Sequence, residues 1–107
     1  MEIKRFGVYF AGLDPTIGRE INKTRLVVVV SKNDMNKYAA TIVICPLTST
    51  IHKNWRSRIQ INCQGKKAEI AVDQIRTIDK QRLLSKYDIL SRKDSARLTA
   101  LIEEMYC

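Results

Sequence analysis

The 107-residue sequence has few of the residues on which metal and disulfide chemistry depend. It contains one histidine, His52, which excludes mechanisms that need two imidazoles and also a histidine-based metal cluster. Its three cysteines stand at wide spacing and include no Cys-x-x-Cys pair, so neither a disulfide framework nor a zinc site is expected. The sequence therefore predicts a protein that uses no metal and no other cofactor.

Long apolar runs are also absent. The longest one covers residues 26–30, which is the length of a strand and far short of the roughly 20 residues that a membrane-spanning helix needs. The first residues contain neither the apolar region nor the small-residue cleavage site of a secretory signal. We therefore expect a cytoplasmic protein with no membrane partner, folded as a single domain over residues 1–107.

Acidic residues are missing from the middle of the chain. None occurs between Asp34 and Glu69, and the whole sequence sets 19 Lys and Arg against 11 Asp and Glu, a net charge of +8. The acid-free stretch contains these basic residues: Lys37, Lys53, Arg56, Arg58, Lys66 and Lys67. Such a stretch is typical of a protein that binds a polyanion such as nucleic acid. It is equally compatible with charge that only keeps the protein in solution, and the charge pattern alone does not separate the two.

Short apolar segments separated by turns predict a mainly β domain. Strands are expected at residues 8–10, 26–30, 41–45, 58–62 and 68–72, with short helical turns or loops at 32–37 and 79–84. The 26–30 segment is β-branched almost throughout, which predicts burial on both faces, whereas 58–62 alternates and should leave one face in water. Pro46 is expected to close the 41–45 strand, and residues 64–66 to form a hairpin turn.

The last part of the chain predicts a helix. Ser91 and Asp94 have the spacing of a capping box. Four apolar residues then follow at helical spacing and form one inward-facing stripe: Leu98, Leu101, Ile102 and Met105. No helix-length segment separates the early strands, so a parallel βαβ arrangement is not expected. Short strands closed by a helix instead predict a small barrel or a strongly curved sheet.

Three polar clusters lie at the ends of predicted strands, at residues 23–25, 48–50 and 73–77. Each one alone is better explained by the chain meeting water at the end of a strand. If the strands at 26–30 and 41–45 pair antiparallel, however, Arg25 and Thr48 come close together. A guanidinium and a hydroxyl both suit phosphate oxygens, so the clusters together favour a phosphate-binding site.

Residues 49–57 are expected to form a basic loop that contains His52 and Trp55. Two alternatives stand for Trp55: it stacks on a base of single-stranded nucleic acid, or it covers part of the barrel. His52 is next to a lysine and is expected to be a solvated loop residue rather than an acid or a base.

Three blocks of the sequence resemble, in order and at similar spacing, the conserved blocks of the MazF/PemK (Kid) family of type II toxin–antitoxin endoribonuclease toxins. They are DPTIGRE at 14–20 with KTR at 23–25 and VVVVS at 27–31, then CPLTS at 45–49, then DQIRTID at 73–79. The resemblance implies a small SH3-like barrel of the CcdB/MazF type with a C-terminal α-helix, which forms a homodimer. It also implies metal-independent, sequence-specific cleavage of single-stranded RNA such as mRNA. A cognate MazE-like antitoxin would inhibit the toxin by laying an acidic tail over its RNA groove.

The resemblance also implies roles for individual residues. The catalytic arginine of the family corresponds to Arg25, its site threonine to Thr48, and an aspartate implicated in some members to Asp73. RNA binding is expected from residues around these and in the basic loop: Arg19, Lys23, Thr24, Ser49, Thr50, Lys53, Trp55, Arg56, Gln74 and Arg76. The sequence also departs from the family pattern. Leu26 replaces a proline after the arginine, Arg19 replaces a small polar residue or histidine, and Ala71 replaces an arginine that some members use.

The implied reaction uses the 2′-hydroxyl of the RNA as nucleophile and leaves a 2′,3′-cyclic phosphate. Arg25 would stabilise the charge that develops on the phosphate, Thr48 would donate a hydrogen bond to it, and Asp73 would orient or deprotonate the 2′-hydroxyl. Two other functions share these sequence features. One is a toxin of the same fold that acts by binding DNA gyrase, as CcdB relatives do, and the other is a non-catalytic RNA-binding barrel.

Overall fold

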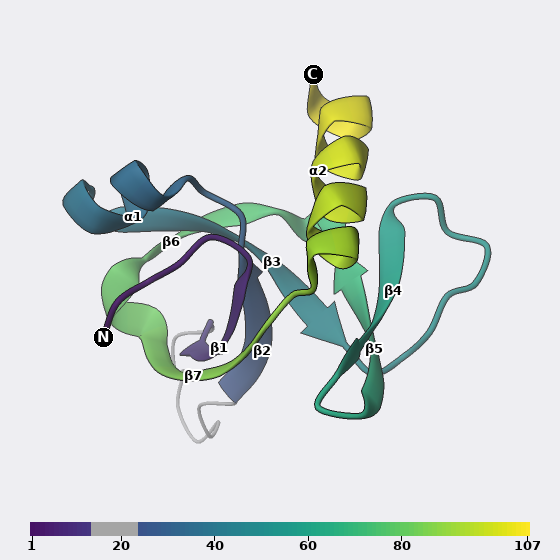
Figure 1. Ribbon diagram of the computed structural model, residues 1–107, viewed down its shortest axis with the longest axis horizontal. Coiled ribbons are helices and arrows are strands. Elements are labelled where there is room, and N and C mark those ends of the chain that lie inside the picture. Colours follow the sequence, from purple (N-terminus) through teal and green to yellow (C-terminus); the bar gives the residue numbers. More distant parts are fainter. Residues whose placement is uncertain (14–23) are drawn as a thin grey trace, which may run out of the picture.

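The computed structural model describes residues 1–13 and 24–107. The polar turn expected within 14–23, with Arg19 and Lys23, lies outside the described residues. The described part contains a seven-stranded sheet in which the strand pairings are antiparallel (Figure 1), so the predicted mainly β class is confirmed. The strands are β1 (Gly7–Gly12), β2 (Thr24–Val29), β3 (Thr41–Thr48), β4 (Arg58–Cys63), β5 (Lys66–Ala71), β6 (Arg76–Asp79) and β7 (Leu83–Ile89).

Strand β3 joins the two halves of the sheet. One edge of β3 pairs with β2, while on its other edge the first half pairs with β6 and the last two residues pair with β5. Pro46 therefore does not close this strand, and the prediction that it would is wrong. It lies in the gap between the β6 ladder, which ends at Ile44, and the β5 ladder, which begins at Leu47. Proline fits this position because neither β5 nor β6 pairs with it on this edge, while β2 pairs with it on the other edge.

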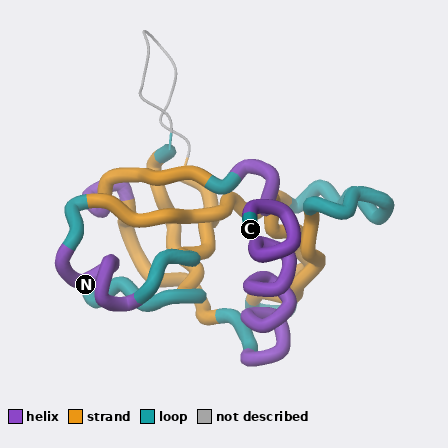
Figure 2. The backbone as a smooth tube through the Cα atoms, turned by 90° about the horizontal axis from the view of Figure 1, so that it is seen from above, coloured by secondary structure: helices purple, strands orange, loops and turns teal. Residues whose placement is uncertain are grey.

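The first half of the sheet curls into a small barrel. Strands β6, β3, β2, β1 and β7 follow one another around it, and the short helical turn η2 (Lys80–Arg82) links β6 to β7. Figure 2 shows the curled strands from above. Apolar side chains fill its interior: Tyr9, Ala11, Leu13, Val27, Val29, Ile42, Ile44, Ile78 and Leu83. The predicted helical turns are present as η2 and as α1 (Asn33–Tyr38).

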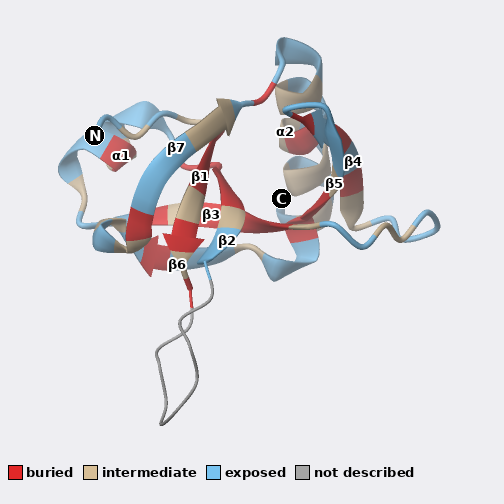
Figure 3. Ribbon diagram, turned by 90° about the horizontal axis from the view of Figure 1, so that it is seen from below, coloured by how far each residue is buried: buried red, intermediate tan, exposed pale blue. Residues whose placement is uncertain are grey.

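A second core lies between the other side of the sheet, the β4–β5 hairpin and the C-terminal helix α2 (Arg92–Tyr106), as Figure 3 shows. Its buried residues are Val8, Val28, Val30, Cys45, Leu47, Ile59, Ile61, Cys63, Ile70, Val72, Leu90 and Leu98. Strand β2 supplies both cores, because Val27 and Val29 face the barrel whereas Val28 faces α2. The predicted burial of this strand on both faces is confirmed, and each such valine contributes roughly 1.5–3 kcal/mol.

The predicted helix is confirmed in its start and in its buried face. The hydroxyl of Ser91 accepts a hydrogen bond of 3.1 Å from the backbone N–H of Asp94, which caps the helix. Leu98 is fully buried, and the rest of the predicted stripe packs against the second core. At the other end, the hydroxyl of Tyr106 donates a 2.8 Å hydrogen bond to the carbonyl of Val72. No helix in the described part of the chain has the length and apolar character needed to cross a membrane.

Strands β6 and β7 were not expected from the sequence. Strand β7 is at the edge of the sheet, its pairing with β1 is irregular at two places, and most of its side chains are exposed or only partly buried. Strand β6 has only four residues, of which Ile78 alone is buried. Neither strand therefore shows the apolar alternation by which β4 was recognised.

The β4–β5 hairpin turns at the predicted place, but its turn has two residues rather than the three expected at 64–66, because Lys66 already belongs to β5. Its turn residues Gln64 and Gly65 have φ angles of 51° and 77°, in the left-handed region that two-residue hairpin turns require. The turn therefore places Cys63 opposite Lys66, and the alternating burial of β4 follows from that register.

Candidate functional site

Arg25 and Thr48 line the same pocket, which has a volume of about 210 Å³. Strands β2 and β3 pair antiparallel as predicted, with Val27 opposite Pro46. Continuing that register by two residues places Arg25 opposite Thr48. The remaining residues that line the pocket are Leu26, Leu47, Ser49, Cys63, Lys66, Lys67, Ala68 and Tyr87. The proximity inferred from strand pairing is thus present in the structure.

The polar side of this pocket is positively charged. Arg25 is exposed, forms no ion pair with any described acidic residue, and is joined in the pocket lining by Lys66 and Lys67. The Oγ1 atom of Thr48 accepts a 3.2 Å hydrogen bond from the backbone N–H of Thr50, which leaves its hydroxyl hydrogen free to be donated. Guanidinium, ammonium and hydroxyl donors around one opening suit the oxygens of a phosphate group.

Leu26 stands where the family pattern has proline, and the structure shows what holds the backbone there. Phe10 lies opposite Leu26, and Ala11 lies opposite Arg25, in an uninterrupted antiparallel register between β1 and β2. Leu26 also packs against the second core. The backbone that carries Arg25 is therefore fixed by strand pairing and packing rather than by a proline ring.

Asp73 does not line this pocket. It belongs to the helical turn η1 (Val72–Gln74), where its carboxylate accepts hydrogen bonds from Arg58 at 2.7 Å (Nε to Oδ1) and 3.4 Å (Nη2 to Oδ2). Partial burial raises the pKa of the Asp73 carboxyl, but the hydrogen bonds and charge of Arg58 outweigh it, and the pKa lies below its ordinary value. Asp73 thus stays outside the pocket that Arg25 and Thr48 line, and its lowered pKa makes its carboxylate a weaker base.

Glu69 was not identified from the sequence, yet it is the most completely buried charged residue of the described chain. Its Oε1 accepts a 2.7 Å hydrogen bond from the backbone N–H of His52, and its Oε2 lies 2.8 Å from His52 Nδ1 and 2.9 Å from Arg58 Nη1. Burial alone raises the pKa of this carboxyl, but the hydrogen bonds from His52 and Arg58 hold it below its ordinary value. The only sequence signal was that Glu69 ends the acid-free stretch.

The loop at 49–57 is attached to the sheet through this cluster. His52 is not a freely solvated residue as expected, because its side chain is 27% exposed and its ring is bound to Glu69. Its ring also stacks on Trp55, with the two centroids 3.8 Å apart and the planes inclined by 19°. Trp55 is 50% exposed, so neither of its two predicted environments is excluded by burial.

The other predicted RNA-binding residues are distributed over three regions. Ser49 lines the pocket and Thr50 is bound to Thr48, while Thr24 is exposed at the start of β2. Lys53 and Arg56 are exposed in the 49–57 loop. Gln74 and Arg76 are exposed on η1 and β6, which contribute nothing to the lining of the pocket.

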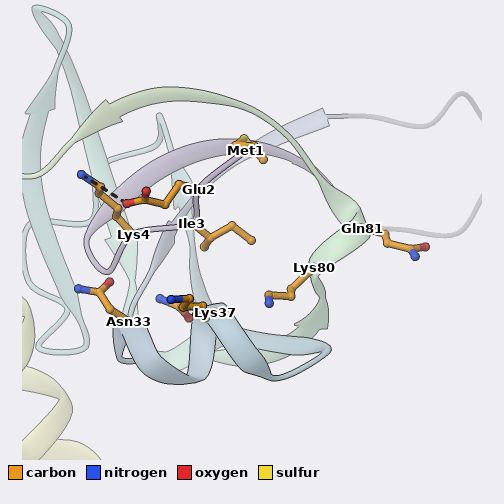
Figure 4. Close-up of a pocket in the computed structure, with 9 residues that line it drawn as sticks. Met1, Glu2, Ile3, Lys4, Asn33, Lys37, Lys80 and Gln81 are labelled. Atoms are coloured by element: carbon orange, nitrogen blue, oxygen red, sulfur yellow. Dashed lines mark ion pairs between the residues drawn. The ribbon is translucent and has the colours of Figure 1, made fainter.

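A larger cavity of the described residues lies elsewhere. It has a volume of about 890 Å³ and opens between the first residues of the chain, α1 and η2 (Figure 4). The residues that line it are Met1, Glu2, Ile3, Lys4, Asn33, Asn36, Lys37, Lys80 and Gln81. None of the predicted site residues that the structure describes is among them, so the size of a cavity does not mark the predicted site here. Within the described ranges, no group of three or more His, Cys, Asp or Glu side chains is placed to hold a metal ion.

Comparison with solved structures defines the class of fold. The chain superimposes on a chain of the MazE–MazF crystal structure (Form-II) from Deinococcus radiodurans with a TM-score of 0.84, covering 98% of this chain and 96% of that one at 17% identity. It is similarly close to an endoribonuclease from Mycobacterial species, with a TM-score of 0.79, coverage of 97% and 90%, and 17% identity. These likenesses confirm the predicted SH3-like barrel of the MazF type with its C-terminal helix.

The sequence places the chain within that class. Residues 4–106 match the family described as the PemK-like, MazF-like toxin of type II toxin–antitoxin systems. The chain is also 35% identical over 91 residues to endoribonuclease EndoA of Bacillus subtilis (strain 168), an alignment that covers 80% of this chain and 78% of that protein. The chain belongs to the PemK-like, MazF-like toxin family, as the three sequence blocks predicted.

Proposed function

We propose that this protein is a cytoplasmic, metal-independent endoribonuclease that cleaves single-stranded RNA, including mRNA, at short specific sequences. The observation that carries the proposal is the pocket in which Arg25 and Thr48 meet, with Lys66 and Lys67 beside them and no acidic side chain among the described residues that line it. A scissile phosphate placed there finds a guanidinium, a hydroxyl donor and two ammonium groups. The endoribonuclease activity of the curated relative supports the proposal.

In the proposed reaction the RNA supplies its own nucleophile. The 2′-oxygen attacks the adjacent phosphorus and loses its proton, and the bond from phosphorus to the 5′-oxygen of the next nucleotide breaks. The products are a 2′,3′-cyclic phosphate and a 5′-hydroxyl, which takes up a proton. Arg25 stabilises the charge on the non-bridging oxygens, and Thr48 donates one hydrogen bond to the same group. Arg25 is not the acid, because a guanidinium scarcely deprotonates in proteins.

The role of Asp73 stays a prediction. Its carboxylate is bound to Arg58 and is not among the residues that line the pocket, so the structure offers no support for direct contact with the 2′-hydroxyl. An indirect contribution, in which Asp73 holds Arg58, agrees better with the geometry.

The proposal includes two partners and a set of RNA contacts. Arg19, Lys23, Thr24, Ser49, Thr50, Lys53, Arg56, Gln74 and Arg76 are proposed to contact RNA on either side of the pocket. A homodimer is proposed as the active form, and an antitoxin with an acidic segment as its inhibitor. Several similar structures are complexes of MazE with MazF or of an endoribonuclease with its cognate antitoxin, which supports a partner of this kind.

Incubation of the purified protein with a long single-stranded RNA in the presence of a chelator tests the proposal. Discrete cuts that end in a 2′,3′-cyclic phosphate are expected, and a 2′-deoxy substitution at a cut site should abolish that cut. RNA that is bound but left intact would instead favour a non-catalytic RNA-binding barrel. If the protein neither binds nor cleaves the RNA, the gyrase-binding alternative is favoured. That alternative gives no reason for the cationic pocket.

The matched pair for this assay is Arg25→Ala and Arg92→Ala. Arg92 is an exposed arginine at the start of α2, outside the pocket. Loss of cleavage by the first variant alone assigns the activity to the pocket, whereas undiminished cleavage by Arg25→Ala overturns the proposal.

A further inference from the structure

We propose that the exposed face of Trp55 is a stacking site for one nucleobase of single-stranded RNA, and that Glu69 is the positioning residue that holds Trp55 in place. The proposal rests on the proposed function and deepens it by adding a base-binding subsite beside the phosphate pocket. The pocket recognises charge, whereas this subsite recognises a flat aromatic ring.

One face of the Trp55 ring is already occupied. His52 stacks on it at a centroid distance of 3.8 Å, and the guanidinium carbon of Arg58 lies 4.6 Å from its centroid. Groups on opposite faces of a ring would be separated by about twice the ~3.5–4 Å contact distance of carbon atoms. His52 Nδ1 and Arg58 Nη1 are instead 3.5 Å apart, so both lie on the same face. Trp55 is 50% exposed, and its other face is the one that neither His52 nor Arg58 covers.

Glu69 holds both groups that cover this face. Its carboxylate binds the backbone and the ring of His52, and it also binds Arg58, whose side chain is only 6% exposed. Asp73 holds the same guanidinium from its other side at 2.7 Å. Because Glu69 is fully buried, breaking its charge-assisted hydrogen bonds would leave a buried charge with fewer partners, which is costly. Trp55 is therefore held against the side chains of His52 and Arg58 before any ligand arrives, which reduces the entropy lost on binding.

The position and charge of Trp55 favour a nucleobase as its ligand. Glu69 lies directly opposite Thr48 in the β3–β5 pairing. The residue that holds His52 and Arg58 against Trp55 is therefore next to a residue that lines the pocket. Lys53 and Arg56 are exposed on either side of Trp55 in the loop, which projects from the sheet between β3 and β4 (Figure 1). A basic path with one aromatic face is the arrangement that binds a strand by its backbone and stacks one of its bases.

The single tryptophan of the chain makes the test direct, because all tryptophan fluorescence comes from Trp55. The probe is a mixed-sequence single-stranded DNA of roughly 12 nucleotides, which lies within common site sizes and lacks the 2′-hydroxyl needed for cleavage. An abasic strand of the same length carries the same charge without bases. The base-bearing strand is expected to quench the fluorescence, whereas the abasic strand is expected to leave it nearly unchanged.

Trp55→Ala is expected to weaken binding of the base-bearing strand roughly 5- to 150-fold, measured by anisotropy of a labelled strand. Its binding of the abasic strand should stay as in the wild type. Tyr38→Ala is the matched control, because Tyr38 is also an exposed aromatic residue, 79% exposed, with the ammonium of Lys37 5.3 Å from its ring centroid. This control should bind both strands as the wild type does.

Glu69→Gln keeps the size of the side chain but removes its charge. It should shift the fluorescence emission of Trp55 in the free protein. It should also weaken binding of the base-bearing strand alone, toward the affinity measured for Trp55→Ala. His52→Ala removes the same link from the side of the loop and leaves the Glu69 carboxylate paired with Arg58, so it decides the matter if Glu69→Gln does not fold. This variant should likewise weaken binding of the base-bearing strand and leave binding of the abasic strand unchanged.

Three results would overturn the inference: wild-type affinity in Trp55→Ala, equal quenching by the abasic strand, or quenching by polyglutamate but not by single-stranded DNA. The last result would show that the loop is a site for an acidic peptide. None of these measurements involves cleavage. They are therefore independent of the proposed function, whose failure would be seen as undiminished cleavage by Arg25→Ala.

Discussion

Thr48 and Glu69 face each other across the pairing of β3 with β5. One of these neighbours lines the cationic pocket and the other anchors the 49–57 loop from a fully buried position. The pairing of β3 with β5 thus fixes both Thr48, the proposed phosphate contact, and Glu69, which anchors the loop. Changes to either strand should therefore alter both features together.

Arg25→Lys should retain the positive charge but lose most of the activity. A lysine cannot reproduce the planar fork that places two donors on one phosphate, so a loss of about 100-fold in turnover is expected, with a smaller change in RNA affinity. Single-turnover cleavage at saturating protein measures the first quantity, and filter binding of a 2′-deoxy strand measures the second. Equal turnover by lysine and arginine would show that Arg25 contributes only charge.

Asp73→Asn should separate a direct role of this carboxylate from an indirect one. The amide retains an acceptor for Arg58 but cannot accept a proton, so a catalytic base would be lost whereas the position of Arg58 would largely be kept. From the ion pair observed here we expect cleavage to fall less than 10-fold, well short of the ~10²–10⁴-fold that general base catalysis contributes. A rate profile over pH that loses its acidic limb in Asp73→Asn would establish the direct role instead.

Stability should decrease in acid. Burial raises the pKa values of Glu69 and Asp73, but hydrogen bonds from His52 and Arg58 to Glu69, and from Arg58 to Asp73, leave both below their ordinary values. The folded state therefore binds fewer protons than the unfolded one. The stabilisation is complete above the ordinary carboxyl pKa values of about 4 and is lost as the pH falls through the lowered ones. Urea unfolding at a series of pH values should show this decline, and Glu69→Gln should make it shallower.

Leu98→Ala should destabilise the fold by about 2–5 kcal/mol, because the fully buried side chain leaves a cavity between α2 and the sheet. Leu84→Ala is the matched control. That leucine is 57% exposed on the edge strand β7, so its removal should change the free energy of unfolding by no more than about 0.5 kcal/mol. Chemical denaturation of both variants gives the comparison, and equal effects would contradict the assignment of α2 to the second core.

The sequence predicted those elements whose pattern depends on local periodicity. The β-branched run of β2, the alternation of β4 and the stripe on α2 each reflect which faces the element buries, and all three were found. The meeting of Arg25 and Thr48 followed from antiparallel pairing alone. Pro46 was misjudged because the pattern could not show that β3 changes partners at that residue.

The cluster around Glu69 could not be predicted in the same way. Burial of a glutamate requires hydrogen-bonding partners. Here the partners are His52, which is 17 residues away in the sequence, and Arg58, which is 11 residues away. The separation from His52 corresponds to no helical or strand repeat and depends on how the 49–57 loop returns over the sheet, which is a tertiary property. The contact with Arg58 instead follows from the register of the β4–β5 hairpin, in which Arg58 lies opposite Ala71, two residues from Glu69.

The sharing of β3 between the barrel and the hairpin has a consequence for local opening. Detachment of β4 and β5 from β3 would remove Lys66, Lys67 and the anchor of the loop, while the barrel that carries Arg25 could stay closed. Thr48 would then lose its partner strand. Ligand-binding capacity should accordingly disappear at a lower denaturant concentration than the barrel itself, and a ligand that bridges both halves should slow amide exchange in β5 more than in β1.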